Sequence, residues 1–420
     1  MNVIIKKPLS FGSLEMISSK SLTHRALIAA ALSNETCIIK RPLLSEDTLA
    51  TIDMLKVMGV NFEIGKNEIK VISQKLKRPM TVLNANESGS TLRFLIPVAL
   101  LNEGYVTFDA KPGLRKRPLS EYISIFKQMN LEFEQENENL PLRVKGPLVP
   151  GSYHIRGDIS SQFITGLLYA LPLLNEDSIL TIDTPIESKD YVDMTLFILK
   201  QFGIDILFKN NSYYIKGNQK YLQKDYEIPG DFSQAAIFLT AGILGADLTL
   251  NRLLLNTHQA DEKIIELIEN MNGNFLIGNG SLKALKSKTT GCIHDLSQSP
   301  DIGPILALLC ALSEGKSEIV NASRLRIKES DRITSITTEL KKMGAKITET
   351  KDGMKIQGVK RLKASMDLDS WNDHRIVMTL AIAAIKTDGV IRIKNAEAIN
   401  KSYPTFFEDY VKLGGEIEYE

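Results

Sequence analysis

Residues 333–349, ITSITTELKKMGAKITE, hold the pattern from which the fold follows. Ile336, Leu340 and Met343 recur at helical spacing, so they predict an amphipathic helix with one buried face. Gly344 comes next, and glycine readily adopts the left-handed conformation that closes a helix. The alternating residues after it predict a short strand. We therefore expect a helix that is joined directly to a strand.

The same pattern occurs at five other places along the chain. In each, an amphipathic helix ends in a bulky apolar residue followed by glycine or asparagine, and a strand-like run comes next. The helix ends fall near Gly59, Asn130, Gly203, Gly273, Gly344 and Gly414. Their spacing of roughly 70 residues is above the range of solenoid repeats. We interpret the chain as six copies of one unit that combines helices with strands.

Six shorter and more apolar helices are predicted between these segments. Their apolar residues lie all round, which is typical of helices packed inside a domain. Each begins with polar residues that favour a helix start. Ordinary capping explains Ser and Asp, but cations are unfavourable at the positive end of a helix unless an anion lies there. The cations at or near these starts and near the C-terminus therefore predict an anion-binding face: Lys20, Arg25, Arg93, Arg332, Arg375 and Lys401.

Composition restricts the class of protein. With 51 basic and 50 acidic residues, the chain has no global charge that would draw it onto nucleic acid or an acidic membrane. Cys37, Cys292 and Cys310 show neither disulfide nor zinc-site spacing. The apolar stretch in the first residues is too short for a signal peptide, and the longest apolar run is too short to span a bilayer. We expect a cytoplasmic protein that binds neither nucleic acid nor membrane.

Residues 323–333, SRLRIKESDRI, concentrate positive charge in a chain whose net charge is only +1. Four cations stand there against Glu329 and Asp331. Such a run is either a solvated helix face or a site built for an anion. Residues three or four apart share a helix face, which places Lys328, Glu329 and Arg332 together and leaves Arg326 to pair with Asp331.

Eight motifs in this order resemble those of the 5-enolpyruvylshikimate-3-phosphate synthases, the 3-phosphoshikimate 1-carboxyvinyltransferase family. The resemblance runs from about residue 5 to the C-terminus. The motifs are SKSLTHRALI (19–28), ESGSTLR (87–93), RKRPL (115–119), SSQF (160–163), SKDYVDMTL (188–196), RLRIKESDR (324–332), NDHR (372–375) and KSYPTFF (401–407).

The resemblance implies a mixed α/β fold of two domains, each with three repeated βαβαββ units. One domain would be residues 18–227 and mainly bind shikimate 3-phosphate, and the other would be residues 1–17 and 228–420. It also implies transfer of the enolpyruvyl group of phosphoenolpyruvate to the 5-hydroxyl of shikimate 3-phosphate, with release of phosphate on the way to chorismate and aromatic amino acids. No cofactor or metal is implied, and we expect a monomer.

The matched motifs also assign residues. Those implied to bind phosphoenolpyruvate are Lys20, Gly89, Arg117, Gln162, Arg332, Arg375 and Lys401. Those implied to bind shikimate 3-phosphate are Lys20, Ser21, Arg25, Ser160, Ser161, Gln162, Ser188, Tyr191, Asp301 and Lys328. Asp301 and Glu329 match the acid/base pair, and Lys20 is expected to assist the departure of phosphate.

The chemistry suits these residue types. Two mutually repelling anions must be held together, and arginine grips carboxylate or phosphate in bidentate fashion while lysine acts as a point charge or proton donor. Two carboxylates in a cationic pocket can share the proton transfers. The sequence leaves open which group moves which proton, and alone it would favour a plain helix cap for Asp301. His374 is equally consistent with a proton-transfer role and a structural one.

Two positions depart from the family pattern, which often has Asn where this chain has Glu87 and Arg324. Two other functions remain open. A UDP-N-acetylglucosamine enolpyruvyl transferase shares the repeated fold, but typically has Lys-Asn where this chain has Lys20-Ser21, and a reactive loop cysteine that is not matched here. A non-catalytic phosphometabolite-binding module would need the cations but would have no use for Asp301 and Glu329.

Overall fold

The computed structural model describes residues 1–135 and 139–420 and divides them into two compact units. Unit 1 contains residues 1–17 and 229–420, and unit 2 contains residues 18–228. The chain therefore passes between the units twice, after Ile17 and after Ile228.

Unit 2 is built from three copies of a βαβαββ unit. The first comprises β14 (Tyr226–Glu227), α1 (Lys20–Leu32), β3 (Thr36–Lys40), α2 (Glu46–Val57), β4 (Asn61–Ile64) and β5 (Glu68–Ile72). The second comprises β6 (Leu83–Asn84), α3 (Gly89–Ala99), β7 (Gly104–Asp109), α4 (Pro112–Arg115), α5 (Ser120–Gln128), β8 (Phe133–Gln135) and β9 (Leu142–Gly146). The third comprises β10 (Ser152–Ile155), α6 (Ser161–Ala170), β11 (Ser178–Ile182), α7 (Lys189–Gln201), β12 (Ile206–Lys209) and β13 (Ser212–Ile215).

Unit 1 repeats this order three times. The first copy is β2 (Phe11–Glu15), α8 (Phe232–Leu244), β15 (Asp247–Asn251), α9 (Ile264–Glu269), β16 (Asn274–Ile277) and β17 (Ser281–Leu285). The second is β18 (Ile293–Asp295), α10 (Gly303–Ala311), β19 (Lys316–Val320), α11 (Arg332–Lys342), β20 (Lys346–Glu349) and β21 (Met354–Gln357). The third is β23 (Leu368–Asp369), α12 (His374–Ala383), β25 (Ile391–Lys394), α13 (Phe406–Lys412), β26 (Glu416–Tyr419) and β1 (Val3–Lys7). Strands β22 (Leu362–Lys363) and β24 (Thr387–Asp388) form a separate pair.

Each copy closes its own four-stranded sheet in the described part of the chain. The strands run in the order first, second, fourth, third, with the first pair parallel and the others antiparallel. In three of the six copies, one strand comes from a distant part of the polypeptide chain. These strands are β14, which pairs with β3, β2, which pairs with β15, and β1, which pairs with β25. The six-repeat fold predicted from the sequence is confirmed.

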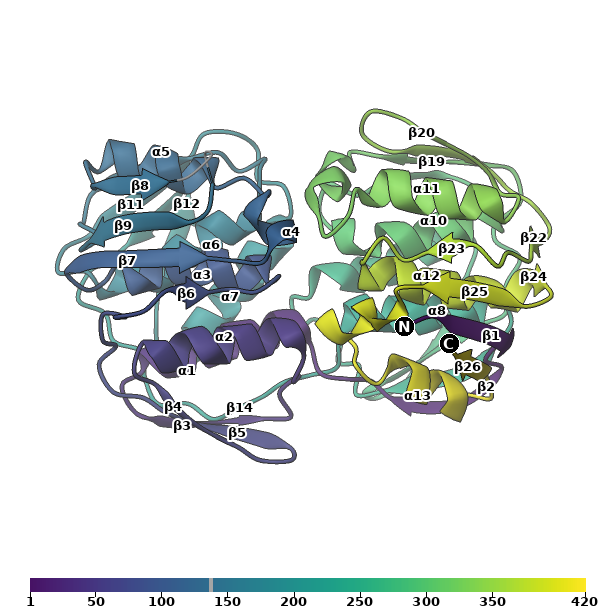
Figure 1. Ribbon diagram of the computed structural model, residues 1–420, viewed down its shortest axis with the longest axis horizontal. Helices are drawn as coiled ribbons and strands as arrows, with labels where there is room; N and C mark the ends of the chain where they lie inside the picture. The colour runs from purple at the N-terminus through teal and green to yellow at the C-terminus, as the bar shows by residue number, and fades with distance from the viewer. Residues whose placement is uncertain (136–138) are drawn as a thin grey trace. The chain divides into compact units, whose positions relative to one another are not determined.

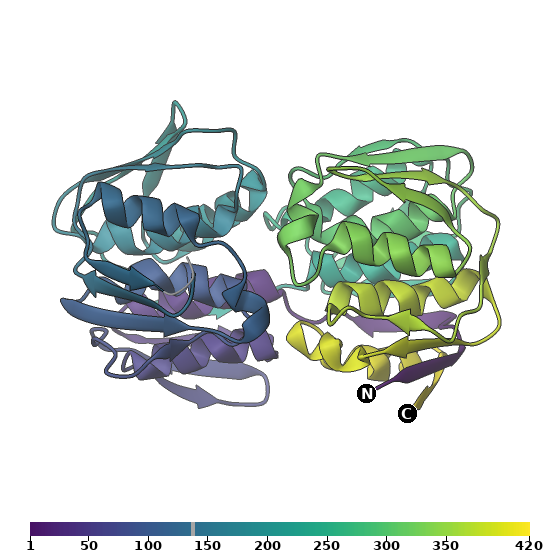
Figure 2. The same cartoon turned by 45° about the horizontal axis from the view of Figure 1, so that its top comes forward.

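The apolar helices lie inside the units, as their patterning predicted. All residues of α8 except Ser233 are buried, and every residue of α10 and α12 is buried. Figure 1 shows sheet β6-β7-β9-β8 in front of α3 and α6, and sheet β18-β19-β21-β20 outside α10 and α11. Figures 1 and 2 both show the two termini side by side, where the backbone N–H of Asn2 donates to the carbonyl of Glu420.

The outer helices end as the sequence predicted, with one shift. Gly344 has φ of 83° and Asn130 has φ of 53°, both in the left-handed region. In the fourth segment the left-handed residue is Asn272, with φ of 66°, and not the predicted Gly273. Gly273 is needed for space instead, because a β-carbon there would lie 2.3 Å from Cγ2 of Ile268.

Side chains cap five of the six inner helices. Ser19, Ser88, Ser160, Asp231 and Asp373 each accept a backbone N–H from the first turn. The exception is α10, which continues from a short 3₁₀ helix, Pro300–Ile302, that carries Asp301. Among the described residues, no helix has both the length and the apolar character needed to cross a bilayer.

Candidate active site

In unit 2, Lys20 opens helix α1 and reaches the start of α2. Its Nζ lies 2.7 Å from Oδ2 of Asp47, and both side chains are mostly buried. Asp47 stands in the first turn of α2, where a carboxylate is favoured by the helix dipole. An ammonium group held in this way has a fixed position.

Arg25 follows Lys20 on the same helix and is held by three acceptors. Its Nη1 donates to the carbonyl of Ser21, its Nη2 to the carbonyl of Tyr191 and its Nε to Oγ1 of Thr195, each at 2.9 Å. The guanidinium also lies 5.0 Å from the centre of the Phe94 ring. Burial lowers the pKa of Arg25, yet an arginine remains charged at neutral pH. Three of the residues predicted to bind shikimate 3-phosphate therefore lie together: Ser21, Arg25 and Tyr191.

Gly89, Arg117 and Gln162 also lie together in unit 2. A β-carbon on Gly89 would lie 3.0 Å from Nη1 of Arg117 and 3.6 Å from Oε1 of Gln162. Gln162 is fixed from both sides, since its Oε1 accepts from Nη1 of Arg93 at 2.6 Å and its Nε2 donates to Oγ of Ser90 at 3.0 Å. Gly89 is the first residue of α3, and a side chain at this helix start would crowd these guanidinium and amide groups.

Three of the four serines predicted to bind shikimate 3-phosphate, Ser160, Ser161 and Ser188, stand at two helix starts. Ser160 caps α6, with its Oγ accepting from the backbone N–H of Gln162, and Ser161 is the first helical residue. Ser188 precedes α7 with φ of 54°, which is uncommon for a residue other than glycine. An observed backbone outlier of this kind is consistent with a preorganised site.

Glu87 is one of the two departures from the family pattern. A β-carbon on Gly113 would lie 2.6 Å from Oε2 of Glu87, so this carboxylate lies against the start of α4. The space beside Gly89 is occupied by Arg117, Arg93 and Gln162.

In unit 1, Asp301 is surrounded by three cations. Its Oδ1 lies 2.9 Å from both Nζ of Lys328 and Nη1 of Arg332, and its Oδ2 lies 3.7 Å from Nη2 of Arg375. Burial alone would raise the pKa of Asp301, but the charges of Lys328, Arg375 and Arg332 outweigh it and hold the pKa well below its ordinary value. Asp301 is therefore a carboxylate at neutral pH.

Arg332 links the two carboxylates predicted to move protons. Its Nη2 lies 2.7 Å from Oε2 of Glu329, while its Nη1 contacts Asp301. The third side of the guanidinium meets Asp373, with Nε 2.8 Å from Oδ2. Burial lowers the pKa of Arg332, but the charges of Asp373, Glu329 and Asp301 outweigh it and raise the pKa. The arrangement fixes Asp301 and Glu329 on one guanidinium.

Arg375 and Lys401 are both buried and both held by backbone carbonyls. Arg375 donates from Nη1 to the carbonyl of Ser233 at 3.1 Å, and Lys401 donates from Nζ to the carbonyl of Asn372 at 2.8 Å. Since Asn372 precedes α12 and Arg375 lies in its first turn, both cations gather at the start of this helix.

Residues 323–333 include both a structural ion pair and residues of the candidate anion site. Arg326 pairs with Asp331 at 2.8 Å, which confirms the predicted structural ion pair. Lys328, Glu329 and Arg332 belong to the buried cluster around Asp301. Burial lowers the pKa of Lys328, and the nearby charge of Arg324 adds to that effect, although Asp301 opposes it.

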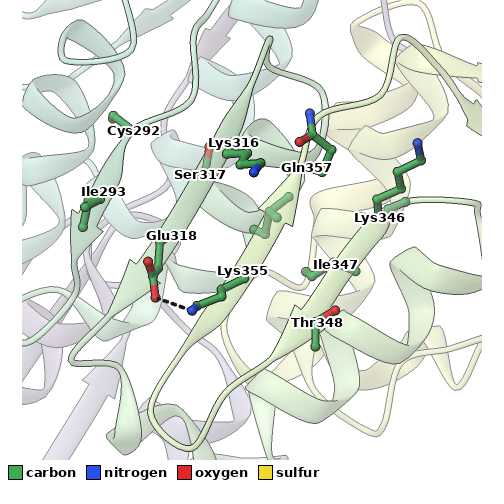
Figure 3. Close-up of a pocket in the computed structure, with 12 residues that line it drawn as sticks. Cys292, Ile293, Lys316, Ser317, Glu318, Lys346, Ile347, Thr348, Lys355 and Gln357 are labelled. Atoms are coloured by element: carbon green, nitrogen blue, oxygen red, sulfur yellow. Dashed lines mark ion pairs between the residues drawn. The ribbon is translucent and has the colours of Figure 1, made fainter.

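A separate groove of about 660 Å³ lies on the outer face of sheet β18-β19-β21-β20 (Figure 3). Lys316, Lys346 and Lys355 line it, and Lys355 reaches Glu318 at 3.7 Å. It contains none of the residues predicted to bind substrates. Exposed lysines without a buried polar partner do not define a specific site, so the helix-start clusters remain the candidates.

Sequence reasoning missed Asp47 and Asp373, which hold predicted residues in place, and it named Arg93 only as part of the anion-binding face. Asp47 pairs with Lys20, Asp373 pairs with Arg332, and Arg93 binds Gln162. Asp47 and Asp373 both stand at helix starts, where an acidic residue is ordinary and signals nothing more. Arg93 belongs to the ESGSTLR motif, and its position near a helix start, where a cation is unfavourable, indicated that it has a role.

Comparisons with known proteins agree on one class. A family model described as EPSP synthase (3-phosphoshikimate 1-carboxyvinyltransferase) matches residues 5–410. A protein of Clostridium novyi (strain NT) with the name 3-phosphoshikimate 1-carboxyvinyltransferase is 46% identical over 420 residues, covering 97% of this chain and 96% of the relative. A protein of the same name from Clostridioides difficile (strain 630) is 40% identical over 420 residues, covering 97% of this chain and 96% of the relative.

Solved structures give the same answer. The EPSP synthase from Acinetobacter baumannii superposes with a TM-score of 0.82 at 26% identity, and the whole of each chain is covered. The enolpyruvyl transferase NikO from Streptomyces tendae superposes with a TM-score of 0.83, covering 100% of this chain and 98% of that one; at 17% identity it shows the fold alone. The fold is thus that of the enolpyruvyl transferases. Within that class, the chain belongs to the EPSP synthase family, the 3-phosphoshikimate 1-carboxyvinyltransferases.

Proposed function

We propose that this protein transfers the enolpyruvyl group of phosphoenolpyruvate to the 5-hydroxyl of shikimate 3-phosphate and releases phosphate. The single observation that carries the proposal beyond family membership is the cluster in which Arg332 holds Asp301 and Glu329 together, at 2.9 and 2.7 Å. A module that only binds phosphometabolites needs the cations but not these two carboxylates. The family match also favours this reaction over transfer to UDP-N-acetylglucosamine.

The reaction adds and then eliminates. The 5-oxygen of shikimate 3-phosphate bonds to C2 of phosphoenolpyruvate and loses its proton, while the methylene carbon gains one, which gives a tetrahedral adduct. The bond from C2 to the phosphate oxygen then breaks, a proton leaves the new methyl group, and the double bond re-forms. We assign the hydroxyl proton to Asp301 and the methylene proton to Glu329, with Lys20 assisting the departing phosphate.

The charges around Asp301 suit this assignment only when substrates are bound. A carboxylate whose pKa is held far below neutrality by Lys328, Arg375 and Arg332 is a weak base. When anionic substrates bind to those cations they offset the positive charge, and the effect of burial then raises the pKa of Asp301 toward the range of a useful base. The free enzyme thus keeps its base ionised, and substrate binding strengthens it.

The family motifs support a substrate-binding role for each of the following residues. Lys20, Ser21, Arg25, Ser160, Ser161, Gln162, Ser188, Tyr191, Asp301 and Lys328 would bind shikimate 3-phosphate. Lys20, Gly89, Arg117, Gln162, Arg332, Arg375 and Lys401 would bind phosphoenolpyruvate. We also propose that the enzyme acts as a cytoplasmic monomer.

Acceptor specificity tests this function. Purified protein is mixed with phosphoenolpyruvate and, in parallel, with shikimate 3-phosphate, with UDP-N-acetylglucosamine or with no acceptor, and released phosphate is measured. Release only with shikimate 3-phosphate is expected. Release with the nucleotide sugar would support the rival transferase, and binding of both substrates without release would support a binding module.

A further inference from the structure

His24 lies between Lys20 and Arg25 on helix α1, and neither the family motifs nor the proposed reaction gives it a role. Its side chain is 1% exposed. Its Nδ1 lies 2.8 Å from Oγ1 of Thr51 on α2. Since His24 is four residues after Lys20 and Thr51 is four after Asp47, the two contacts lie one helical turn apart and both join α1 to α2.

The contact continues from Thr51 into helix α3. Oγ1 of Thr51 lies 2.6 Å from Oγ1 of Thr91, which is also 2.7 Å from Oγ of Ser88 and 3.2 Å from the carbonyl oxygen of Asp47. All three hydroxyl-bearing side chains are at most 1% exposed. Ser88 and Thr91 flank Gly89, so a buried hydrogen-bonded chain runs from His24 to the helix start that carries the predicted phosphoenolpyruvate site.

Counting protons gives this chain a direction. Each hydroxyl has one proton, and the carbonyl of Asp47 only accepts. If Thr91 donates onward to that carbonyl or to Ser88, Thr51 must donate to Thr91, and the proton between His24 and Thr51 must come from Nδ1. The other ring nitrogen supports a proton on Nδ1, because Nε2 of His24 is buried without a hydrogen-bond partner among the described residues. A buried lone pair left unpaired is more common than a buried N–H left unpaired.

We infer that His24 is a positioning residue, whose Nδ1–H donates to Thr51 at the head of a buried chain that fixes the Gly89 helix start relative to the ammonium of Lys20. This inference rests on the proposed function, since it assigns His24 to the placement of groups for that reaction. Burial, with the nearby charges of Lys20 and Arg25, holds the pKa of His24 well below its usual value, so the imidazole stays neutral and keeps one proton for this bond.

Substitutions separate the hydrogen bond from the volume of the ring. His24→Asn places an amide near the position of Nδ1, whereas His24→Leu removes the donor and keeps apolar bulk. Misplacement of a substrate-binding group by about 1 Å costs up to about 100-fold in rate. We expect His24→Leu to lower kcat/KM for phosphoenolpyruvate by about 10- to 100-fold, with a raised KM, and His24→Asn to recover most of that loss.

The chain also predicts coupling between its members. Thr51→Val removes the hydroxyl at constant shape, so it breaks the same chain. Because either change interrupts the same hydrogen-bonded chain, the double variant Thr51→Val with His24→Leu should lose no more activity than the worse single variant. His294→Asn is the matched control, since this imidazole is equally buried, lies in unit 1 and contacts Cys292 instead; its kinetic constants should equal those of the parent.

A spectroscopic test needs no substrate. The nitrogen NMR signals of His24, assigned by their loss in His24→Asn, report which ring nitrogen carries the proton. The expected result is an Nδ1–H imidazole that stays neutral at pH 6. An Nε2–H tautomer, equal activity of His24→Asn and His24→Leu, or additive losses in the double variant would each overturn the positioning role. Should the parent protein release no phosphate, the proposed function fails while the tautomer result still stands.

Discussion

Nε of Arg332 lies 2.8 Å from Oδ2 of Asp373, and neither side chain is more than 1% exposed. Asp373 also accepts the backbone N–H of Arg375 at the start of α12 and the hydroxyl of Ser330. One carboxylate therefore ties the starts of α11 and α12 together and balances the charge of the arginine that holds Asp301 and Glu329.

Removing this carboxylate should destabilise unit 1. Breaking a buried ion pair at one partner typically costs about 3–5 kcal/mol when the other charge is left unpaired. Arg332 would keep Asp301 and Glu329 as partners, so we expect a loss near the lower end of that range. Asp373→Ala should lose about that much, and Asp373→Asn less, since asparagine still caps α12. The chain's one tryptophan, Trp371, lies in unit 1, so its fluorescence during urea unfolding reports this unit. If Asp373→Ala unfolds with the same urea midpoint as the parent protein, the prediction is wrong.

Glu329 should affect turnover more than binding. If it handles a proton, Glu329→Gln should lower kcat by about 10²–10⁴ with a modest change in KM. Glu349→Gln is the matched control, because Glu349 contacts Arg326 of the same motif but lies outside the Asp301 cluster. Steady-state kinetics decide the outcome. An unchanged kcat for Glu329→Gln would remove this residue from the mechanism.

Asp301 should make the stability of unit 1 depend on pH in the acidic range. Because its folded-state pKa is lowered, its contribution is fully present above the unfolded-state pKa of about 3.9 and is lost as pH falls through the lower folded-state value. Asp301→Asn should therefore be clearly less stable than the parent at pH 7, and the difference should shrink below about pH 4. Urea unfolding monitored by the fluorescence of Trp371 measures the stability of the parent and of Asp301→Asn at each pH. A difference that does not change with pH would show that Asp301 is not paired in this way.

Gly89→Ala should weaken phosphoenolpyruvate binding without unfolding the protein. The new methyl group would lie 3.0 Å from Nη1 of Arg117 and 3.4 Å from Nη1 of Arg93, so the two guanidinium groups must shift. Alanine suits the helix position itself. We expect a raised KM for phosphoenolpyruvate and weaker inhibition by an anion that mimics it, such as glyphosate. Gly65→Ala, in an exposed turn of unit 2, is the control. Equal inhibition of the Gly89 variant and the parent would place the phosphate elsewhere.

The sequence predicted the repeat because the pattern of each unit is local. The apolar spacing of residues 333–343 and the left-handed Gly344 need no distant partner to be recognised. The start of α10 was harder, since Asp301 looked like an ordinary cap and lies instead on a 3₁₀ turn among three cations. Its partner Arg332 is 31 residues away, and one sequence does not reveal which acid meets which base.

The same reason explains the unpredicted residues of the site. His24, Thr51 and Thr91 are each unremarkable in their own helices, and only the packing of α1, α2 and α3 makes them a chain. Asp47 and Asp373 were also unremarkable in the sequence, because acidic residues are common at helix starts. Motif resemblance named the groups expected to touch substrates, whereas the groups that hold them depend on tertiary packing.

Phosphorus NMR of the complete reaction tests the proposed function most directly. Purified protein is added to equimolar phosphoenolpyruvate and shikimate 3-phosphate, and the signals of both substrates, free phosphate and the product are followed together. We predict that the two substrate signals fall at equal rates while free phosphate and the 3-phosphate signal of the product rise in equal amounts, and that Glu329→Gln slows all four changes alike. Persistence of both substrate signals with folded protein, or release of phosphate without loss of shikimate 3-phosphate, would contradict it.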